Sequence, residues 1–252
     1  MSKDRFKDAL WYNKPARILV FGAGGIGSWT SFFLTRAGFN VLSVDYDLVE
    51  EHNLGGQMFL HQDIGESKVI ALHNTIALFN DNDYSFTYRN EKLVQETNLY
   101  NLINTRGGYA SRESPIIIIS AFDNMEARKL LFEKFLAVCN NEYSSVTPDK
   151  IWFVDGRLLM EQMRIYCIPG DNQQFHMDYI DNHLFADSDV EDLMCTMKQV
   201  SHGAAMIATH ITGFVTNIIS NVTEWDDNVF KIPYMWDYII PFNKLTENYE
   251  AR

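Results

Sequence analysis

The chain has 252 residues, of which 46% are hydrophobic and 21% charged, as in an ordinary globular protein with room for one sizeable domain. Its net charge of −12 argues against general binding to nucleic acid, which requires a basic face. Cys139, Cys167 and Cys195 form no Cys-x-x-Cys pair, so we expect reduced thiols, a cytoplasmic location and neither a disulfide framework nor a four-cysteine zinc site.

The first fourteen residues are charged and lack the apolar core of a signal peptide. Within them, residues 3–12 predict a short helix that precedes the first strand. No apolar run approaches the ~20 residues that a membrane-spanning helix requires, so we expect no membrane partner.

A strand, a glycine-rich loop and a helix then follow one another. The continuous apolar run Ile18–Phe21 predicts a strand that is buried on both faces. The loop Gly22–Gly27 comes directly after it, and residues 28–37 predict a helix that ends at Gly38. This order of elements is typical of a nucleotide-binding loop and is not expected of a turn that merely happens to be rich in glycine.

Each glycine of this loop has a separate physical role. Gly22 permits the tight turn, Gly24 lets a phosphate approach the backbone, and Gly27 lets the helix pack closely on the strand. Free N–H groups at the helix start, near Gly25, face an anion. Asp45 ends the next predicted strand 18 residues after Gly27, close to the ~20 expected of an acid that binds ribose hydroxyls. The pattern predicts a nucleotide without saying which one.

Helices and strands continue to alternate along the rest of the chain. The apolar run Pro115–Ser120 predicts the clearest buried strand, and Asp123 lies just past its C-terminal end, where ligands bind in open α/β sheets. We further expect irregular structure at 50–67, helices at 68–79, 98–104, 124–140 and 201–222, and strands at 84–88, 152–155, within 157–169 and in the tail 229–242.

Residues 170–194 are acidic and predict a loop, which either crosses the molecule or lies solvated on the surface. The uncharged helix at 201–222 is expected to be buried against the sheet or in a dimer contact. We therefore predict one α/β domain, 1–252, with a Rossmann-like doubly wound mixed sheet, parallel in its N-terminal part and antiparallel in its C-terminal strands. Its appendages are an N-terminal helix (1–14), a crossing loop (170–200) and a C-terminal helix with strands (201–252).

These motifs together resemble the ThiF/MoeB/HesA family of ubiquitin-activating-like adenylating enzymes. The resemblance spans most of residues 15–222. It is carried by GAGGIGS (22–28), VDYD (44–47), Asn53-Leu54 with Gln57, GESKV (65–69), SAFDNMEARKLL (120–131) and the segment from Cys195 to Asn221. The resemblance implies the family fold and an ATP-dependent adenylation.

The resemblance and the chemistry assign the same roles. Lys68, at the start of a helix, would neutralise phosphate charge, and Asp123 would bind Mg²⁺, which prefers carboxylate ligands. Asp47, Asn53 and Gln57 carry over as polar contacts to the nucleotide. Asp123 could also cap the helix that follows it, and capping does not exclude metal binding. Arg128, on that helix, is expected to be structural.

Cys195 precedes the predicted helix at 201–222, whose positive dipole end would lower the pKa of a thiol. Lys198 and His202 are near it in sequence. It is therefore a candidate nucleophile that would take the acyl group as a thioester, or alternatively an ordinary small residue at a helix start.

The chain departs from the family pattern in two places. Gly56 stands where the family has an arginine that contacts the triphosphate, and the candidates to substitute for it are Arg5, Arg17 and a residue of another subunit. The two zinc-binding Cys-x-x-Cys pairs of the family are also missing, so no zinc is expected.

The leading prediction is ATP-dependent adenylation of a carboxylate, most simply the C-terminal glycine of a ubiquitin-like or sulfur-carrier protein, by a homodimer. One alternative is a nucleotide-binding or assembly subunit without catalysis, as Gly56 would permit. Another is an NAD-dependent oxidoreductase, since Asp45 suits NAD as well as ATP. A third is adenylation of a small carboxylate, such as one on a modified tRNA base.

Overall fold

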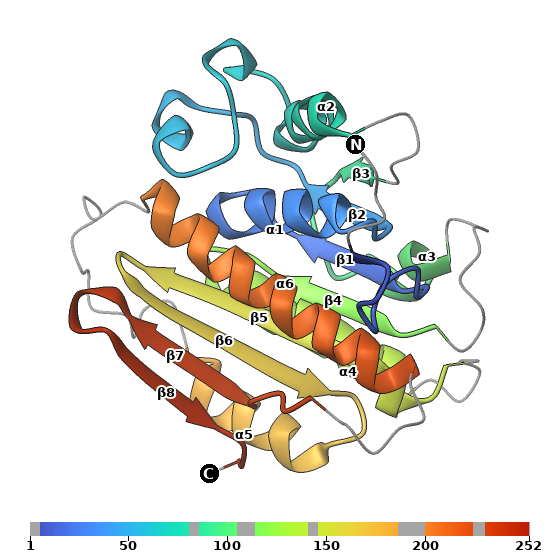
Figure 1. Ribbon diagram of the computed structural model, residues 1–252. Helices are drawn as coiled ribbons and strands as arrows, with labels where there is room; N and C mark the ends of the chain where they lie inside the picture. Colours follow the sequence, from blue (N-terminus) through green and yellow to red (C-terminus); the bar gives the residue numbers. More distant parts are fainter. Residues whose placement is uncertain are drawn as a thin grey trace.

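One mixed eight-stranded sheet organises the chain, in the order β3-β2-β1-β4-β5-β6-β7-β8 (Figure 1). The computed structural model describes residues 6–80, 86–104, 114–140, 146–185, 200–223 and 230–251. The strands are β1 (Arg17–Phe21), β2 (Val41–Asp45), β3 (Phe86–Asn90), β4 (Ile116–Ser120), β5 (Ile151–Leu159), β6 (Gln162–Pro169), β7 (Met235–Ile239) and β8 (Lys244–Asn248).

Strands β1 to β5 pair in parallel, and β5 to β8 pair antiparallel. The predicted doubly wound mixed sheet, with its parallel N-terminal part and antiparallel C-terminal strands, is therefore confirmed. The chain turns in opposite directions from β1, toward β2 on one side and toward β4 on the other. In open α/β sheets such a switch of strand order opens a crevice at the carboxyl ends of the strands, where ligands bind.

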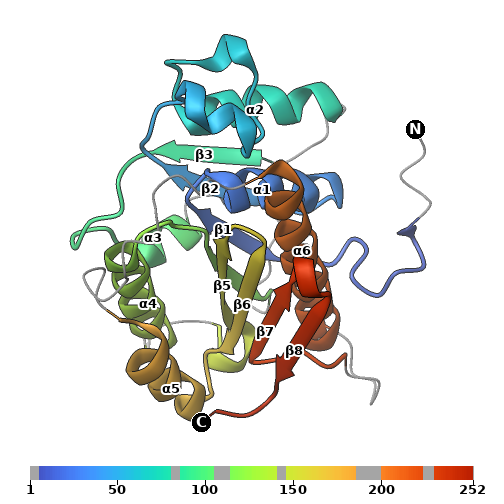
Figure 2. The ribbon, with the colours of Figure 1, turned by 90° about the vertical axis from the view of Figure 1, so that its left-hand side faces the viewer.

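Helices cover both faces of the sheet (Figure 2). One face carries α1 (Gly25–Arg36), α2 (Lys68–Phe79) and α6 (Ser201–Thr223), and the other α3 (Leu99–Asn104), α4 (Met125–Cys139) and α5 (Gln173–His183). Short 3₁₀ turns complete the described elements: η2 (Glu51–Gly55), η3 (His61–Asp63), η4 (Pro148–Lys150) and η6 (Ile240–Phe242).

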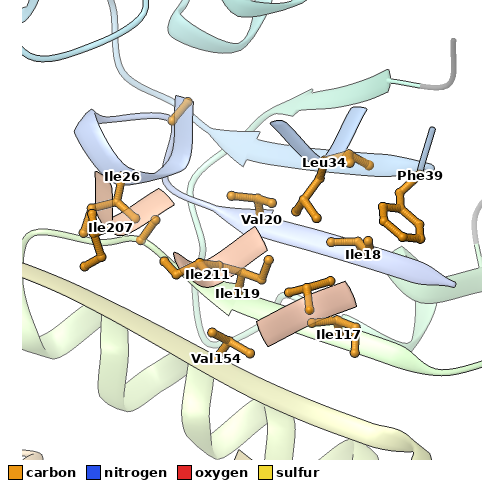
Figure 3. Packing of buried hydrophobic residues seen from close by; sticks show 14 of the residues in the cluster. Ile18, Val20, Ile26, Leu34, Phe39, Ile117, Ile119, Val154, Ile207 and Ile211 are labelled. Carbon is orange, nitrogen blue, oxygen red and sulfur yellow. The ribbon is translucent and has the colours of Figure 1, made fainter. Parts of the chain in front are cut away.

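The central strands are apolar throughout because each face of the sheet is covered. In β4, Ile117 and Ile119 pack beneath α1 and α6, whereas Ile116 and Ile118 face the side of α4. Figure 3 shows the first of these two cores, in which Ile207 and Ile211 of α6 meet the strand residues. The two-residue period of the pleat thus turns one apolar run into two cores.

The predicted N-terminal helix is wrong for the part of it that the structure describes. Residues 6–13 form turns, joined by i→i−3 bonds such as those from Ala9 N to Phe6 O and from Tyr12 N to Ala9 O. The ring of Trp11 packs on Phe39, with 5.7 Å between the centroids. The segment is fixed by this apolar contact rather than by helical hydrogen bonds.

The loop predicted over 170–200 is also wrong in part, because residues Gln173–His183 form α5. Asn172 begins the helix by accepting a hydrogen bond from Phe175 N at 3.0 Å. Asp178, counted among the solvated acids, is buried and accepts a hydrogen bond from the Tyr234 hydroxyl at 2.7 Å. Tertiary partners therefore outweigh the acidic composition. Residues 186–199 lie outside the described part of the chain.

Among the described helices, α6 is long and apolar enough to cross a membrane, but half of its most apolar window is buried. Its buried residues, including Ala204, Ala208 and Val215, lie along a face that packs on α1 and the sheet. A core helix of a folded domain has these properties as well. The expectation that α6 is buried against the sheet is confirmed, and dimerisation stays a prediction.

Gly27 should tolerate no side chain. A Cβ built there would lie 1.7 Å from the carbonyl oxygen of Gly22, which belongs to the backbone and cannot move aside cheaply. We expect Gly27→Ala to lower the free energy of unfolding by about 3 kcal/mol, measured by urea denaturation. Gly213→Ala is the control, because nothing lies within 4 Å of its added Cβ on α6, and it should stabilise the protein by about 0.5–1 kcal/mol. Equal stability of the two variants would contradict this packing.

Candidate active site

A cleft of about 870 Å³ lies along the carboxyl ends of the parallel strands. It begins at the loops after β2 and β3, passes the glycine loop and the end of β4, and reaches the β5–β6 hairpin. Nine of the ten residues predicted to bind the nucleotide line it: Gly22, Gly24, Gly25, Asp45, Asp47, Asn53, Gln57, Lys68 and Asp123. The tenth, Gly27, packs α1 on the loop instead, as its predicted role requires.

The glycine loop packs tightly against its neighbours at Gly22 and Gly27 and is open at Gly24. Gly22 has a φ of +93°, and a Cβ there would lie 2.7 Å from the carbonyl oxygen of Ala121 at the end of β4. A Cβ added at Gly24 would meet no atom closer than Gln57 Nε2, at 4.0 Å. Because Gly24 precedes the first turn of α1, the free N–H groups of that turn face the cleft and can receive a phosphate.

Asp45 holds the glycine loop in place. Its Oδ2 accepts a hydrogen bond from Ala23 N at 2.6 Å, and its Oδ1 accepts one from Asp47 N at 2.7 Å. Burial raises the pKa of this carboxyl group above its ordinary value, against the opposing effect of the two N–H donors and of Lys68. Each oxygen keeps a further lone pair, so the carboxylate can hold the loop and still accept a ribose hydroxyl.

Lys68 and Asp47 form an ion pair at the same end of the cleft. The Nζ of Lys68 lies 2.9 Å from Asp47 Oδ2, and the lysine side chain is 11% exposed against 47% for the aspartate. Lys68 begins α2, as predicted from the sequence. The pair places one ammonium group beside the phosphate-binding loop, where it can neutralise phosphate charge.

The η2 segment supplies the polar residues opposite the loop. Asn53 is buried, and its Oδ1 accepts a hydrogen bond from Glu50 N at 2.8 Å. Trp29 Nε1 donates to Gly56 O at 3.1 Å, which fastens this segment to α1 at the position where the family resemblance implies an arginine. The Oε1 of Gln57 is buried and accepts no hydrogen bond within the described structure. Buried acceptors are paired with protein, water or a ligand, and because Gln57 lines the cleft a bound ligand is one source of the missing donor.

Asp123 lies exposed in the cleft just past β4, and Asn124 caps the helix. The Oδ1 of Asn124 accepts a hydrogen bond from Ala127 N at 2.8 Å, so capping does not occupy the Asp123 carboxylate. Arg128 donates from Nη2 to the carbonyl of Phe122, the residue before Asp123. The expected structural role of Arg128 is thus to fix the backbone that presents Asp123.

Asp155 is a fully buried carboxylate held between two arginines. Arg157 Nε lies 2.6 Å from its Oδ2, Arg128 Nη1 lies 3.4 Å from its Oδ1, and the Tyr179 hydroxyl donates to Oδ2 at 2.9 Å. Burial alone would raise the pKa of Asp155, but the charges of Arg128 and Arg157 outweigh it and hold the pKa below its ordinary value. This group ties β5 to α4 and α5 beneath the cleft.

Two cleft residues were not recognised from the sequence. Arg157 and Arg164 lie opposite each other in the β5–β6 register and line the end of the cleft away from the glycine loop. The two arginines are equally far from the Met160-Glu161 turn in sequence. A prediction that placed the hairpin turn at these two residues would therefore have paired the arginines. Met160 has a φ of +56°, and neither of these residues is typical of a tight hairpin turn.

Arg17, one of the substitutes suggested for the missing arginine, does not reach the cleft. Arg17 begins β1 and pairs with Ile116, which places it at the amino end of the sheet, opposite the cleft. Arg5, Cys195 and Lys198 lie outside the described residues, and His202 is an exposed residue at the start of α6. The arginines that the structure brings to the cleft are instead Arg128, Arg157 and Arg164.

The residues present fit a nucleotide with one metal ion. The described part of the chain holds no group of three or more ligands that would bind a metal by itself. Magnesium, however, is commonly held by one or two carboxylates together with the phosphates of the substrate. Asp123, exposed in the cleft, meets that requirement, and the orphaned Gln57 oxygen and the open Gly24 position suit the nucleotide.

A sequence model of the ThiF family matches residues 12–245, and the chain belongs to this family. Among curated proteins, ubiquitin-like modifier-activating enzyme 5 of Drosophila persimilis is 32% identical over 131 residues, which are 51% of this chain and 34% of that protein. The Xenopus laevis protein of the same name is 33% identical over 114 residues, 44% of this chain and 28% of that protein. The match thus spans about a third of the length of these relatives.

Solved structures share the fold at lower identity. MccB of E. coli with AMPCPP and MccA has a TM-score of 0.66 and 14% identity, and the match covers 100% of this chain and 69% of MccB. PaaA has a TM-score of 0.66 and 17% identity, with 96% of this chain and 66% of PaaA covered. The structure of MccB with ATP also matches, with a TM-score of 0.64 at 14% identity. This likeness confirms the Rossmann-type fold.

Removal of the Asp155 charge should destabilise the protein and change how its stability depends on pH. Asp155→Asn leaves Arg128 and Arg157 buried without their carboxylate, so we expect a loss of about 3 kcal/mol at neutral pH. In the wild type, the depressed pKa of Asp155 contributes to the free energy of unfolding above about pH 4, the ordinary pKa of the unfolded state. This contribution is lost as the pH falls through the lower pKa of the folded state. The variant should therefore lose less stability on acidification.

Urea unfolding across an acidic pH series measures both effects. Asp171→Asn is the control, because Asp171 is exposed, and it should change stability at neutral pH by less than about 0.5 kcal/mol. Equal pH slopes for wild type and Asp155→Asn would show that Asp155 is not the group whose protonation is linked to unfolding.

Proposed function

We propose that this protein catalyses the ATP-dependent adenylation of a carboxylate, most simply the C-terminal glycine of a ubiquitin-like or sulfur-carrier protein. One observation carries the proposal: a single cleft at the strand switch holds the glycine loop, Asp45, Lys68 and Asp123 together. The names of the curated relatives, ubiquitin-like modifier-activating enzymes, and the solved complex of MccB with ATP support it.

The loop and its supports would bind and orient ATP. The N–H groups at the start of α1 receive phosphate oxygens beside Gly24, and Asp45 accepts hydrogen bonds from ribose hydroxyls. Lys68 then lowers the electrostatic cost of bringing an anionic carboxylate toward an anionic phosphate. The acceptor carboxylate attacks the α-phosphorus, the bond to the β-phosphate oxygen breaks, and pyrophosphate leaves with that electron pair.

Asp123 would hold Mg²⁺ through its carboxylate, and its position is fixed by Arg128 and by the cap at Asn124. When bound, the ion neutralises charge on the phosphate oxygens. Gly56 stands where the family resemblance implies a cation, and Lys68 of α2 supplies the cleft lining with an ammonium group.

We include a thioester step on Cys195, a homodimer and a cytoplasmic location as predictions of the same proposal. In that step, the Cys195 thiolate attacks the acyl carbon of the adenylate and releases AMP, which forms a thioester. Cys195→Ala should abolish a thiol-sensitive conjugate with the acceptor, seen on non-reducing gels, and should leave adenylation intact. Cys167→Ala is the control, because Cys167 is fully buried on β6 and burial raises the pKa of its thiol. A conjugate that survives Cys195→Ala would contradict this step.

ATP–pyrophosphate exchange tests adenylation directly, with purified protein, Mg²⁺ and carrier proteins ending in Gly-Gly. We expect exchange in the wild type, its loss by at least about a hundredfold in Asp123→Ala because phosphate charge is no longer neutralised, and its persistence in Cys195→Ala. Asp149→Ala, an exposed acid that does not line the cleft, should retain full exchange.

Two results would contradict the proposal. ATP binding without exchange for any carrier would favour a nucleotide-binding or assembly subunit without catalysis. Binding of NAD in place of ATP would favour an oxidoreductase on the same fold.

A further inference from the structure

The carboxylates that line the cleft lie toward its nucleotide end, together with Lys68 and Lys92. These carboxylates, Asp45, Asp47, Glu91, Asp123 and Glu126, come from the segments that follow β2, β3 and β4. The β5–β6 hairpin contributes no carboxylate to the lining but two arginines. In a protein with a net charge of −12, a cleft end lined by arginines is a local feature that composition does not explain.

These arginines are only partly neutralised by the protein. Asp155 is shared by Arg128 and Arg157, and Arg164 pairs with Asp237 through Nε at 2.7 Å. Among the described residues, these three guanidinium groups pair with two carboxylates, an excess of one positive charge. An anion is the ligand that such a surplus favours.

Arg164 is the arginine that is placed to meet a ligand. Its side chain is 38% exposed, against 16% for Arg157 and 7% for Arg128. It directs Nε and Nη2 to Asp237 and also hydrogen-bonds the Tyr166 hydroxyl, which leaves N–H donors of the five-donor guanidinium for a ligand. The Asp237 carboxylate, which Gln162 also contacts, holds the guanidinium in one orientation. A guanidinium group that is already ordered loses less entropy when it binds a carboxylate.

The extended hairpin also provides a floor for a peptide. Asp155 pairs with Ser120, the last residue of β4, so β5 continues four residues beyond it, to Leu159. Leu159 and Phe185 line the same end of the cleft and are 51% and 42% exposed. An extended segment could pass over these apolar side chains toward Asp123.

The spacing of the strands sets where an anionic group would lie on that segment. Arg164 is on β6, two strands from β4, which corresponds to about 10 Å. An extended chain covers this distance in about three residues. An acceptor whose terminal carboxylate lies beside Asp123 would thus place the side chain about three residues from its end near Arg164.

We propose that the β5–β6 end of the cleft is a specificity site in which Arg164 binds an acidic side chain about three residues before the C-terminal carboxylate of the acceptor. The inference rests on the proposed function, because it concerns the acceptor of the same adenylation. It narrows the acceptor from any carrier with a Gly-Gly end to one whose C-terminal segment is acidic.

Binding of short fluorescent peptides to the full chain, followed by anisotropy in the presence of Mg²⁺ and a non-hydrolysable ATP analogue, tests this without turnover. The peptides end in Gly-Gly and differ only just before it, where they carry Asp-Glu, Asn-Gln or Lys-Lys. We expect the acidic peptide to bind about fivefold more tightly than the neutral one, the basic peptide to bind most weakly, and the differences to shrink at high salt.

Variants then assign the preference to one residue. Arg164→Gln should bind the acidic and neutral peptides equally, and Arg164→Lys should keep most of the preference. Arg89→Gln should not change it, because Arg89 is an exposed arginine of β3 that does not line the cleft. Thermal unfolding identifies any variant that fails to fold.

Both the wild-type peptide series and the Arg164→Gln series can overturn the inference. Equal binding of the three peptides, or a preference that Arg164→Gln retains, would contradict the specificity site even if exchange establishes adenylation. Absence of measurable binding for every peptide would contradict it as well. Loss of the proposed function would appear separately, as absence of pyrophosphate exchange with acidic and neutral carriers alike.

Discussion

The contact between the glycine loop and the end of β4 fixes the geometry of the whole cleft. Gly22 sits so close to Ala121 that a single Cβ would meet its carbonyl oxygen, and Gly27 brings α1 onto Gly22 in the same way. Asp45, at the end of β2, accepts a hydrogen bond from Ala23 N of the glycine loop. Three separate parallel strands are thereby locked at one point, and the start of α1 is aimed along the sheet edge.

From that point, each further part of the cleft is positioned by a different kind of interaction. On the nucleotide side, hydrogen bonds to backbone N–H groups and a partly exposed ion pair hold Asp45 and Lys68. On the far side, the fully buried Asp155 fastens the hairpin to α4 and α5 through two arginines and Tyr179. An ion pair beneath a site is an uncertain source of net stability, but it fixes geometry, since its partners satisfy one another in a single arrangement.

The sequence predicts the parallel half of this molecule well because its signals are local. An apolar run before Gly22, a helix that begins at Lys68 and an acid after β4 each follow from residues that are neighbours in the chain. The same holds for the nucleotide side of the cleft, where nine predicted residues meet. The roles of those residues toward a ligand stay predictions.

The rest depends on contacts that are distant in sequence. The segment around Trp11, where a helix was expected, is held by an apolar contact with Phe39. Asp178, where a loop was expected, accepts a hydrogen bond from Tyr234, 56 residues away in the sequence. Arg157 and Arg164 become neighbours only through the register of a hairpin whose turn carries no typical turn residues. Composition and hydrophobic periodicity describe neighbouring residues and do not predict contacts between residues that are distant in sequence.

The two halves of the cleft therefore differ in origin as well as in charge. In the proposed adenylation, the half that carries the glycine loop holds the nucleotide, whatever carboxylate is the acceptor. The half built from the β5–β6 hairpin presents side chains on an extension of the sheet, where Asp155 and Asp237 hold the two arginines. Discrimination between acceptors requires such a surface, because phosphate and ribose contacts are identical for every acceptor. The charge carried by Arg164, rather than the glycine loop, is thus the feature of this chain that would distinguish one carboxylate from another.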